Sequence, residues 1–124
     1  MREQSLFDII YYKNKRGEKQ VKEYIQELNN KIDKNSRIKF NKIVEYIRRL
    51  QQYGIKIGKP TIDKIEGSNL WELRPFKDRI FFAYWKEDTF ILLHHFEKKT
   101  QKTPKREIEQ AKHNFEDWKE RFGE

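Results

Sequence analysis

Two arginines, Arg74 and Arg79, flank a short connection between two strand-like segments of the sequence. If these segments form a hairpin with a four-residue connection, the two arginines stand opposite each other on one face of the sheet. That register places Glu72 and Phe81 on the same face as the arginines. The opposite face then carries only apolar side chains, which are those of Trp71, Leu73, Ile80 and Phe82. We therefore expect one face of the hairpin to pack on helices and the other to carry two neighbouring guanidinium groups.

The paired guanidinium groups predict a site for an anion. Like charges directly opposite each other are unfavourable unless a negative charge compensates them, and Glu72 supplies only part of that charge. A phosphate group compensates better, because the planar fork of an arginine matches two phosphate oxygens. The alternative is a cluster of surface salt bridges without a ligand, and the charge pattern alone leaves both interpretations open.

A basic run extends from Lys98 to Arg106 and contains no acidic residue. It connects the end of a predicted strand to the beginning of a helix, where free backbone N–H groups and the helix dipole add to the positive field. Many runs of this kind are only solvated surface. The position of this run favours a functional site, because sites are commonly built on loops at strand ends.

Three histidines, His94, His95 and His113, limit the acid–base and metal chemistry of the chain. His94 and His95 are adjacent on a predicted strand, so they point to opposite faces and do not serve one site. One of them could act as a general acid or base near neutral pH, and either could equally be a buried, hydrogen-bonded histidine. The spacing predicts no metal site, and neither a glycine-rich phosphate loop nor a serine or cysteine nucleophile is recognisable.

The composition describes a basic chain of 124 residues, with 28 lysines and arginines against 20 acidic residues and a formal charge of +8. This length fits one domain over residues 1–124. The charge favours a polyanionic partner, and a basic, well-solvated surface is the alternative. No run of about 18 apolar residues predicts a membrane span, and cysteine is absent. Because Met1 to Phe7 lack the regions of a signal peptide, we expect a cytoplasmic protein.

Apolar spacing predicts the elements that precede these residues. A strand is expected over residues 5–12, and its apolar side chains on both faces indicate an interior place in a sheet. Helical spacing predicts a helix over residues 18–29 and a second from residue 35 or 36 to Tyr53, ended by Gly54. These helices are expected to form an antiparallel hairpin.

The second half of the chain predicts strands followed by one helix. Strands are expected at 70–75, 79–85 and 89–96, with connections short enough for antiparallel hairpins and a further short strand at 62–65. The helix is expected to begin at Pro104, with Thr103 as its N-cap, and to end at Gly123. The resulting fold class is α+β, with an N-terminal strand, a helical hairpin, an antiparallel sheet and a C-terminal helix.

Several segments of the second half carry a family resemblance. They are Leu70 to Arg74, Asp78 to Phe82, Leu92 to His94, Phe96 to Pro104, Glu107, Ile108 and Ala111. These segments resemble the RelE/HigB-like toxins of type II toxin–antitoxin systems, in the phage-related HigB-like branch of the RelE superfamily. The lysine run that ends in Thr103 and Pro104 is the most specific part. The first half agrees only in layout, and His95 stands where family members often have a small residue.

The resemblance implies a RelE-like fold and a metal-independent, ribosome-dependent endoribonuclease that acts without a cofactor. Such an mRNA interferase cleaves mRNA by attack of the ribose 2′-OH on the adjacent phosphate and thereby inhibits translation. That chemistry needs a base, cations for the phosphorane and an acid for the leaving oxygen. The implied partners are mRNA on the ribosome and a cognate antitoxin, which we expect to be a HigA-like helix-turn-helix protein.

The resemblance also implies roles for residues of this chain. Arg74 and Arg79 would stabilise the phosphorane. Lys98, Lys99 and Lys102 would hold the RNA backbone, and one of them could act as acid or base if its neighbours depress its pKa. His94 and Tyr84 are weaker candidates, and the predicted register places Tyr84 on the face opposite Arg74. The remaining expected RNA-binding residues are Lys77, Lys105 and Arg106.

Two other functions fit the same sequence. The basic loop would also serve a non-catalytic module that binds RNA or the ribosome on the same fold. Alternatively, the apolar helix stripes could belong to a protein-interaction domain, although burial in the core is their usual role.

Overall fold

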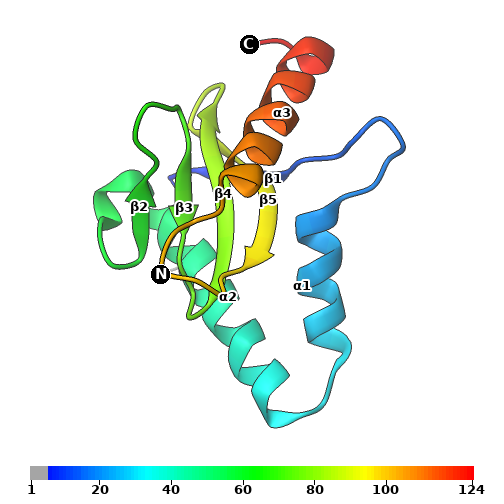
Figure 1. The fold of residues 1–124 in the computed structure, drawn as a ribbon, viewed down its shortest axis with the longest axis vertical. Coiled ribbons are helices and arrows are strands. Elements are labelled where there is room, and N and C mark those ends of the chain that lie inside the picture. Colours follow the sequence, from blue (N-terminus) through cyan, green and yellow to red (C-terminus); the bar gives the residue numbers. More distant parts are fainter. Residues whose placement is uncertain (1–5) are drawn as a thin grey trace.

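The computed structural model describes residues 6–124, so Ser5, the first residue of the predicted first strand, and most of the segment from Met1 to Phe7 lie outside the described residues. The elements, shown in Figure 1, are β1 (Asp8–Tyr11), α1 (Gln20–Asn30), α2 (Lys34–Tyr53), the 3-10 helix η1 (Gly54–Ile57), β2 (Ile62–Lys64), β3 (Trp71–Leu73), β4 (Asp78–Trp85), β5 (Thr89–Glu97) and α3 (Lys105–Phe122). This order confirms the predicted α+β fold class.

The five strands form one sheet in the order β1-β5-β4-β3-β2. Neighbouring strands from β2 to β5 are antiparallel, as expected, whereas β1 is parallel to β5. The sheet is therefore mixed, and the prediction of an interior place for the first strand is wrong, because β1 lies at an edge. Its two apolar faces have another cause: Ile9 packs against the core on one side of the sheet and Ile10 against the core on the other.

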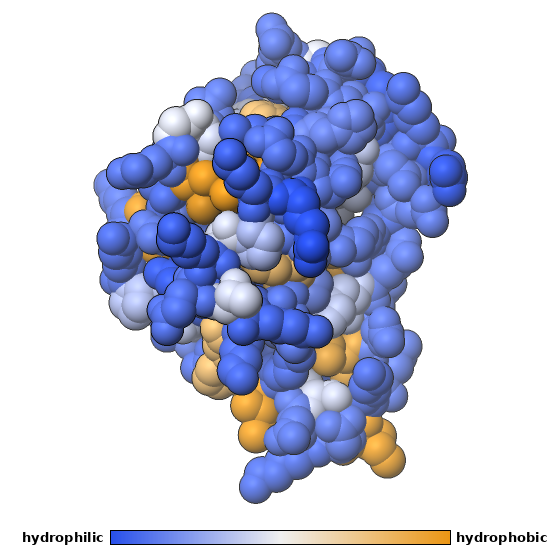
Figure 2. Space-filling model, viewed as in Figure 1, coloured by the Kyte–Doolittle hydropathy of each residue, from blue (hydrophilic) through white to orange (hydrophobic). Residues whose placement is uncertain are grey.

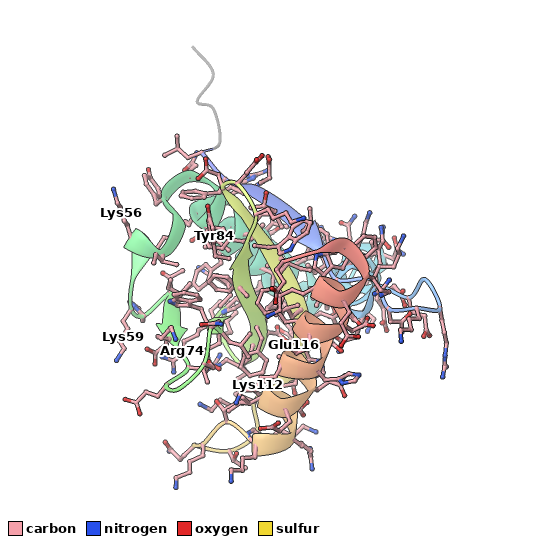
Figure 3. All side chains as sticks on the ribbon, turned by 90° about the horizontal axis from the view of Figure 1, so that it is seen from above. Lys56, Lys59, Arg74, Tyr84, Lys112 and Glu116 are labelled. Carbon is pink, nitrogen blue, oxygen red and sulfur yellow. The ribbon has the colours of Figure 1, made fainter. Side chains whose placement is uncertain are left out.

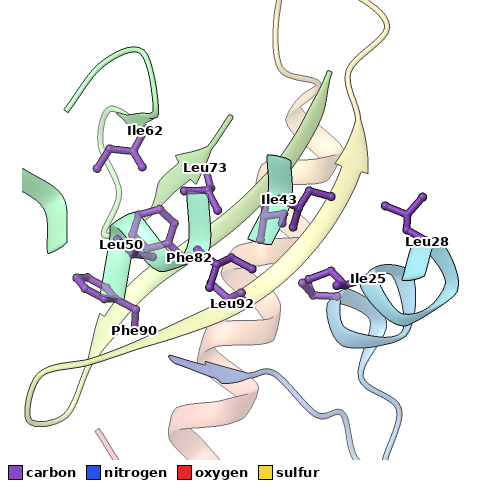
Figure 4. Packing of buried hydrophobic residues seen from close by; sticks show 12 residues of the cluster. Ile25, Leu28, Ile43, Leu50, Ile62, Leu73, Phe82, Phe90 and Leu92 are labelled. Atoms are coloured by element: carbon purple, nitrogen blue, oxygen red, sulfur yellow. The ribbon is translucent and has the colours of Figure 1, made fainter. Parts of the chain in front are cut away.

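Helices cover both faces of the sheet, with α1 and α2 on one side and α3 on the other (Figure 1). Figure 4 shows the core on the α1–α2 side, where side chains from both helices meet those of the strands. Fully buried members of this core include Ile43, Leu50, Leu73, Ile80 and Phe82. The core on the α3 side is built from Phe81, Ile91, Leu93, Ala111, Phe115, Trp118 and their neighbours. The sheet therefore separates two apolar layers.

The helix ends follow the local sequence at α2 but not at the start of α3. Helix α2 begins one residue earlier than expected because the Asp33 carboxylate accepts a hydrogen bond from the backbone N–H of Ser36 at 2.9 Å. Gly54 ends this helix with φ near 62°. The prediction of Thr103 as the N-cap of α3 is wrong, because Pro104 occupies that position and the Thr103 hydroxyl donates instead to Glu72 Oε2 at 3.4 Å. Among residues 6–124, no helix has the length and apolarity needed to cross a membrane.

Candidate phosphate-binding site

The register of the β3–β4 hairpin determines which side chains share a face. Glu72 pairs with Phe81 and Leu73 with Ile80, which is the predicted register. As predicted, Leu73 and Ile80 belong to the core on the α1–α2 side. Phe81, on the face of the arginines, belongs to the core on the α3 side, so this face also packs on a helix, which was not expected. Continuing this alternation places Arg79 on the α3 side, next to the turn of the hairpin.

A groove of about 710 Å³ lies between this hairpin and the loop that leaves β5. Its lining residues are Arg74, Lys77 and Arg79 from the hairpin, and Glu97, Lys98, Lys99, Thr100 and Gln101 from the end of β5 and the loop. The structure thus brings together five side chains predicted to bind RNA or phosphate, with Glu97 as the carboxylate among them. The backbone N–H of Lys98 donates to the carbonyl oxygen of Lys77 at 2.7 Å, which joins the two walls.

Arg79 is the most deeply buried cation of the groove, with only 8% of its surface exposed. Its Nη1 donates to the carbonyl oxygens of Phe76 at 2.7 Å and Asp78 at 2.9 Å. Burial, followed by the positive charge of Arg74, lowers the pKa of its guanidinium. Its buried Nε has no hydrogen-bond partner in the described part of the chain. A buried cation next to a like charge, with a donor unsatisfied, indicates a site that a phosphate would stabilise.

Arg74 is held by carboxylates on its own side of the hairpin. Its Nε lies 3.7 Å from Glu72 Oε1, and its Nη1 lies 3.8 Å from Asp63 Oδ2. Glu72 is buried and supplies the partial compensation expected from the sequence. The role of Asp63 was not foreseen, because it depends on β2 pairing with β3. Figure 3 shows Arg74 at the end of β3 and Tyr84 well apart from it.

The remaining basic residues of the run lie outside the lining of the groove. Lys102, Lys105 and Arg106 are exposed and continue along the loop into the first turn of α3. Figure 2 shows that this side of the molecule is mostly hydrophilic, with apolar residues in small patches. These three cations extend the positive surface from the groove toward α3 without adding to the enclosed part of the site.

His94 is not brought together with the two arginines. A register shift between Phe81 and Phe82 leaves Leu93 as an extra residue of β5, so the His94 ring stacks beside Phe81 on the α3 side. Its Nε2 lies 2.8 Å from Glu107 Oε1. The ring lines a separate depression of about 380 Å³ between α3 and the segment that follows β1.

His95 points to the opposite face, as predicted for adjacent strand residues, and belongs to a buried polar network. Its Nε2 lies 2.8 Å from Asp78 Oδ1, and its ring stacks on Tyr24 at 3.7 Å. The Tyr24 hydroxyl donates to the same carboxylate oxygen at 2.8 Å, and Lys39 Nζ lies 3.8 Å from Asp78 Oδ2. Lys39 also pairs with the groove residue Glu97 at 3.2 Å.

This network reaches the groove through Asp78, whose carbonyl oxygen accepts from Arg79. Burial acts to raise the pKa of Asp78, but hydrogen bonds from His95 and Tyr24, with the charge of Lys39, outweigh it and lower the pKa. Burial raises the pKa of Tyr24 to about 12. The sequence analysis missed this network because its members come from four different elements.

Metal-binding residues do not gather in the part of the chain described here. Among residues 6–124, no group of three or more histidine, cysteine, aspartate or glutamate residues is arranged to hold a metal ion. The cations of the groove suit the binding of a phosphodiester and the stabilisation of charge on it.

A comparison against protein families identifies the family of the chain. The chain matches the phage-derived Gp49-like family (DUF891) over residues 23–116. The protein belongs to this family, which is a RelE-toxin-like family. The match begins in α1 and ends in α3, so it includes most of α1 and all of α2, where the sequence analysis expected agreement only in layout. No curated protein matches the chain.

Proposed function

We propose that this protein is the toxin of a type II toxin–antitoxin system and that it cleaves mRNA in the cytoplasm as a metal-independent, ribosome-dependent endoribonuclease of the HigB-like branch. The observation that carries the proposal is the groove in which Arg79, fixed by two backbone carbonyls, lies beside Arg74 and the lysines of the loop. Membership in a RelE-toxin-like family supports it.

The proposed reaction is an internal transfer within the RNA. The ribose O2′ forms a bond to the adjacent phosphorus while the bond from phosphorus to the 5′ oxygen breaks. One proton leaves the 2′-OH, and another is delivered to the departing 5′ oxygen. The phosphorane formed on the way carries additional negative charge on its oxygens. Cations fixed before the RNA binds stabilise this charge without a cost of reorganisation.

Residues of the groove divide these tasks. Arg79 and Arg74 stabilise the phosphorane oxygens, because an arginine fork binds two oxygens at once. Lys98 and Lys99 bind the backbone on the opposite wall, with Lys77 at the tip of the hairpin. Outside the groove, Lys102, Lys105 and Arg106 bind flanking phosphates. One of the loop lysines transfers a proton, and the ribosome aligns the RNA so that a sparse site suffices.

The proposed partners are mRNA on the ribosome and an antitoxin. We expect the antitoxin to be a HigA-like helix-turn-helix protein encoded next to the toxin gene. Its binding would suppress toxicity.

Inducible expression tests the proposal. Expression of the wild type should arrest growth and fragment mRNA, and the variant with Arg74→Ala and Arg79→Ala should do neither. The matched control is Lys13→Ala with Lys56→Ala, which removes two positive charges from exposed positions outside the groove. Thermal unfolding of each purified variant shows whether the loss reflects the site or the fold, because Arg79 is buried.

The same experiment separates this proposal from a non-catalytic RNA- or ribosome-binding module. A module would bind ribosomes with a salt dependence set by its phosphate contacts, but it would leave mRNA intact with or without ribosomes. Toxicity that persists in the folded double arginine variant would show that the site lies elsewhere.

A further inference from the structure

Phe76 combines two locally unfavourable features at the tip of the β3–β4 hairpin. Its side chain is 53% exposed. Its backbone has a φ of 57°, in the left-handed region. Among residues 6–124, three non-glycine residues have a positive φ, and Phe76 is the aromatic one. For an L-residue with a bulky side chain, this conformation is a genuine outlier.

The turn itself does not need an aromatic residue. Pro75 followed by a residue with positive φ is the pattern of a type II turn, whose third position favours glycine or asparagine. Either residue would adopt the observed backbone at lower cost and would expose less apolar surface. Departures from such local preferences are expected where a residue serves function, so the exposed ring indicates a contact with a ligand.

The surroundings of the ring are cationic and fixed. The Phe76 carbonyl accepts from Arg79 Nη1 at 2.7 Å, and the backbone N–H of Asp78 donates to the carbonyl of Pro75 at 3.0 Å. Lys42 Nζ lies 5.3 Å from the centre of the ring. The next residue, Lys77, lines the groove. The ring is therefore held next to the groove, with a further cation from α2 over the ring.

We propose that the Phe76 ring stacks on a nucleobase of an RNA strand whose phosphates occupy the groove. This inference rests on the proposed function and adds a contact to the base, which the groove cations do not provide. Single-stranded RNA is bound by this combination of a cationic track for the backbone and exposed aromatic rings for the bases. An apolar protein surface fits less well, because it offers no anionic group to Lys77 and the lysines of the groove.

The test compares two substitutions at this position. Phe76→Asn removes the ring and suits the left-handed backbone, so the variant should unfold at or above the temperature of the wild type. Phe76→Tyr keeps the ring. The control is Tyr53→Ala, which removes a ring of similar exposure, 56%, at the C-terminal end of α2. The probes are a fluorescent 12-nucleotide RNA with 2′-O-methyl groups, which block cleavage, and the same backbone with abasic nucleotides.

Phe76→Asn should weaken binding of the RNA with bases by at least about 5-fold, since stacking contributes about 1–3 kcal/mol per base. Binding of the abasic probe should not change, and Phe76→Tyr and Tyr53→Ala should bind both probes like the wild type. An equal loss on both probes would overturn the proposal, because the ring would then act through the shape of the groove.

The remaining outcomes separate this inference from the proposed function. If Phe76→Asn binds RNA and cleaves it like the wild type, the stacking role is overturned and the proposed function stands. If the wild type neither binds nor cleaves RNA, both are overturned. If the substitution weakens only the binding of the protein encoded by the adjacent gene, Phe76 contacts a protein partner and the inference is wrong.

Discussion

Arg79 donates a hydrogen bond from Nη1 to the carbonyl oxygen of Phe76 over 2.7 Å. The guanidinium and the tip of the hairpin are therefore one unit, and the charge is oriented before any ligand arrives. Such preorganisation is what makes a cation effective in stabilising a transition state.

Arg79→Lys tests whether orientation is needed in addition to charge. Lysine keeps the positive charge but lacks the planar fork, so it cannot hold both carbonyls and still present two donors to a phosphate. We expect the rate of RNA cleavage to fall about 100-fold to 1,000-fold, the usual cost of losing one fixed donor to a developing charge. Arg49→Lys on α2, outside the groove, is the control and should cleave at the wild-type rate. If the Arg79→Lys variant is folded and fully active, Arg79 is not part of the catalytic site.

Lys98→Ala tests the contact of the loop with the RNA backbone. A lysine that neutralises one phosphate releases the counterions bound there, so the RNA-binding constant depends on the salt concentration. Removing one such contact should reduce the slope of the logarithm of the binding constant against the logarithm of the salt concentration by about 0.7 for single-stranded RNA. Fluorescence anisotropy over a series of salt concentrations measures this slope. Lys56→Ala removes a charge outside the groove and should leave the slope unchanged. An unchanged slope for Lys98→Ala would place the RNA elsewhere on the surface.

Asp78→Asn tests the buried network behind the groove. Because the pKa of Asp78 is lowered in the folded protein, its stabilising contribution is complete above its ordinary value of about 3.9. This contribution is lost as the pH falls through the lowered pKa. Asp78→Asn should therefore reduce the free energy of unfolding at neutral pH by roughly 1–3 kcal/mol. It should also make the acid decline in stability less steep.

Denaturant unfolding at several pH values measures both effects. Asp117 also has a lowered pKa, mainly because of its hydrogen bond with Arg121, so part of the acid decline should remain in the Asp78→Asn variant. Asp117→Asn is the matched comparison, since it lies on the α3 side and should leave the Asp78 contribution intact. A pH profile identical to that of the wild type would show that the Asp78 network does not contribute as the geometry indicates.

Most of the fold could be predicted because local patterns report it directly. Alternation along residues 71–82 identified both faces of the β3–β4 hairpin correctly, and helical spacing located α1, α2 and α3 to within a few residues. The place of β1 was not predictable in this way. Apolar side chains on both faces show that a strand is covered on both sides, but they do not show how many strands flank it.

The cationic part of the candidate site was also predictable, because Arg74, Arg79 and the loop lysines are close to strand ends that a hairpin brings together. The Asp78 network was not, since Tyr24 and Asp78 are 54 positions apart in the chain. The packing of α1 against the sheet creates their hydrogen bond, and no local pattern of residues marks it. The same applies to Lys39, which reaches Glu97 across 58 positions.

His94→Gln tests the remaining histidine of the expected site. The imidazole pairs with Glu107 and lines the depression between α3 and the segment that follows β1, away from Arg74 and Arg79. We therefore expect the variant to cleave RNA at a rate close to that of the wild type, with the same dependence on pH, and His113→Gln is the control. Loss of a general acid or base would instead reduce the rate by about 100-fold to 10,000-fold. Such a loss, with the fold intact, would show that His94 reaches the reacting atoms once the RNA and the ribosome are bound.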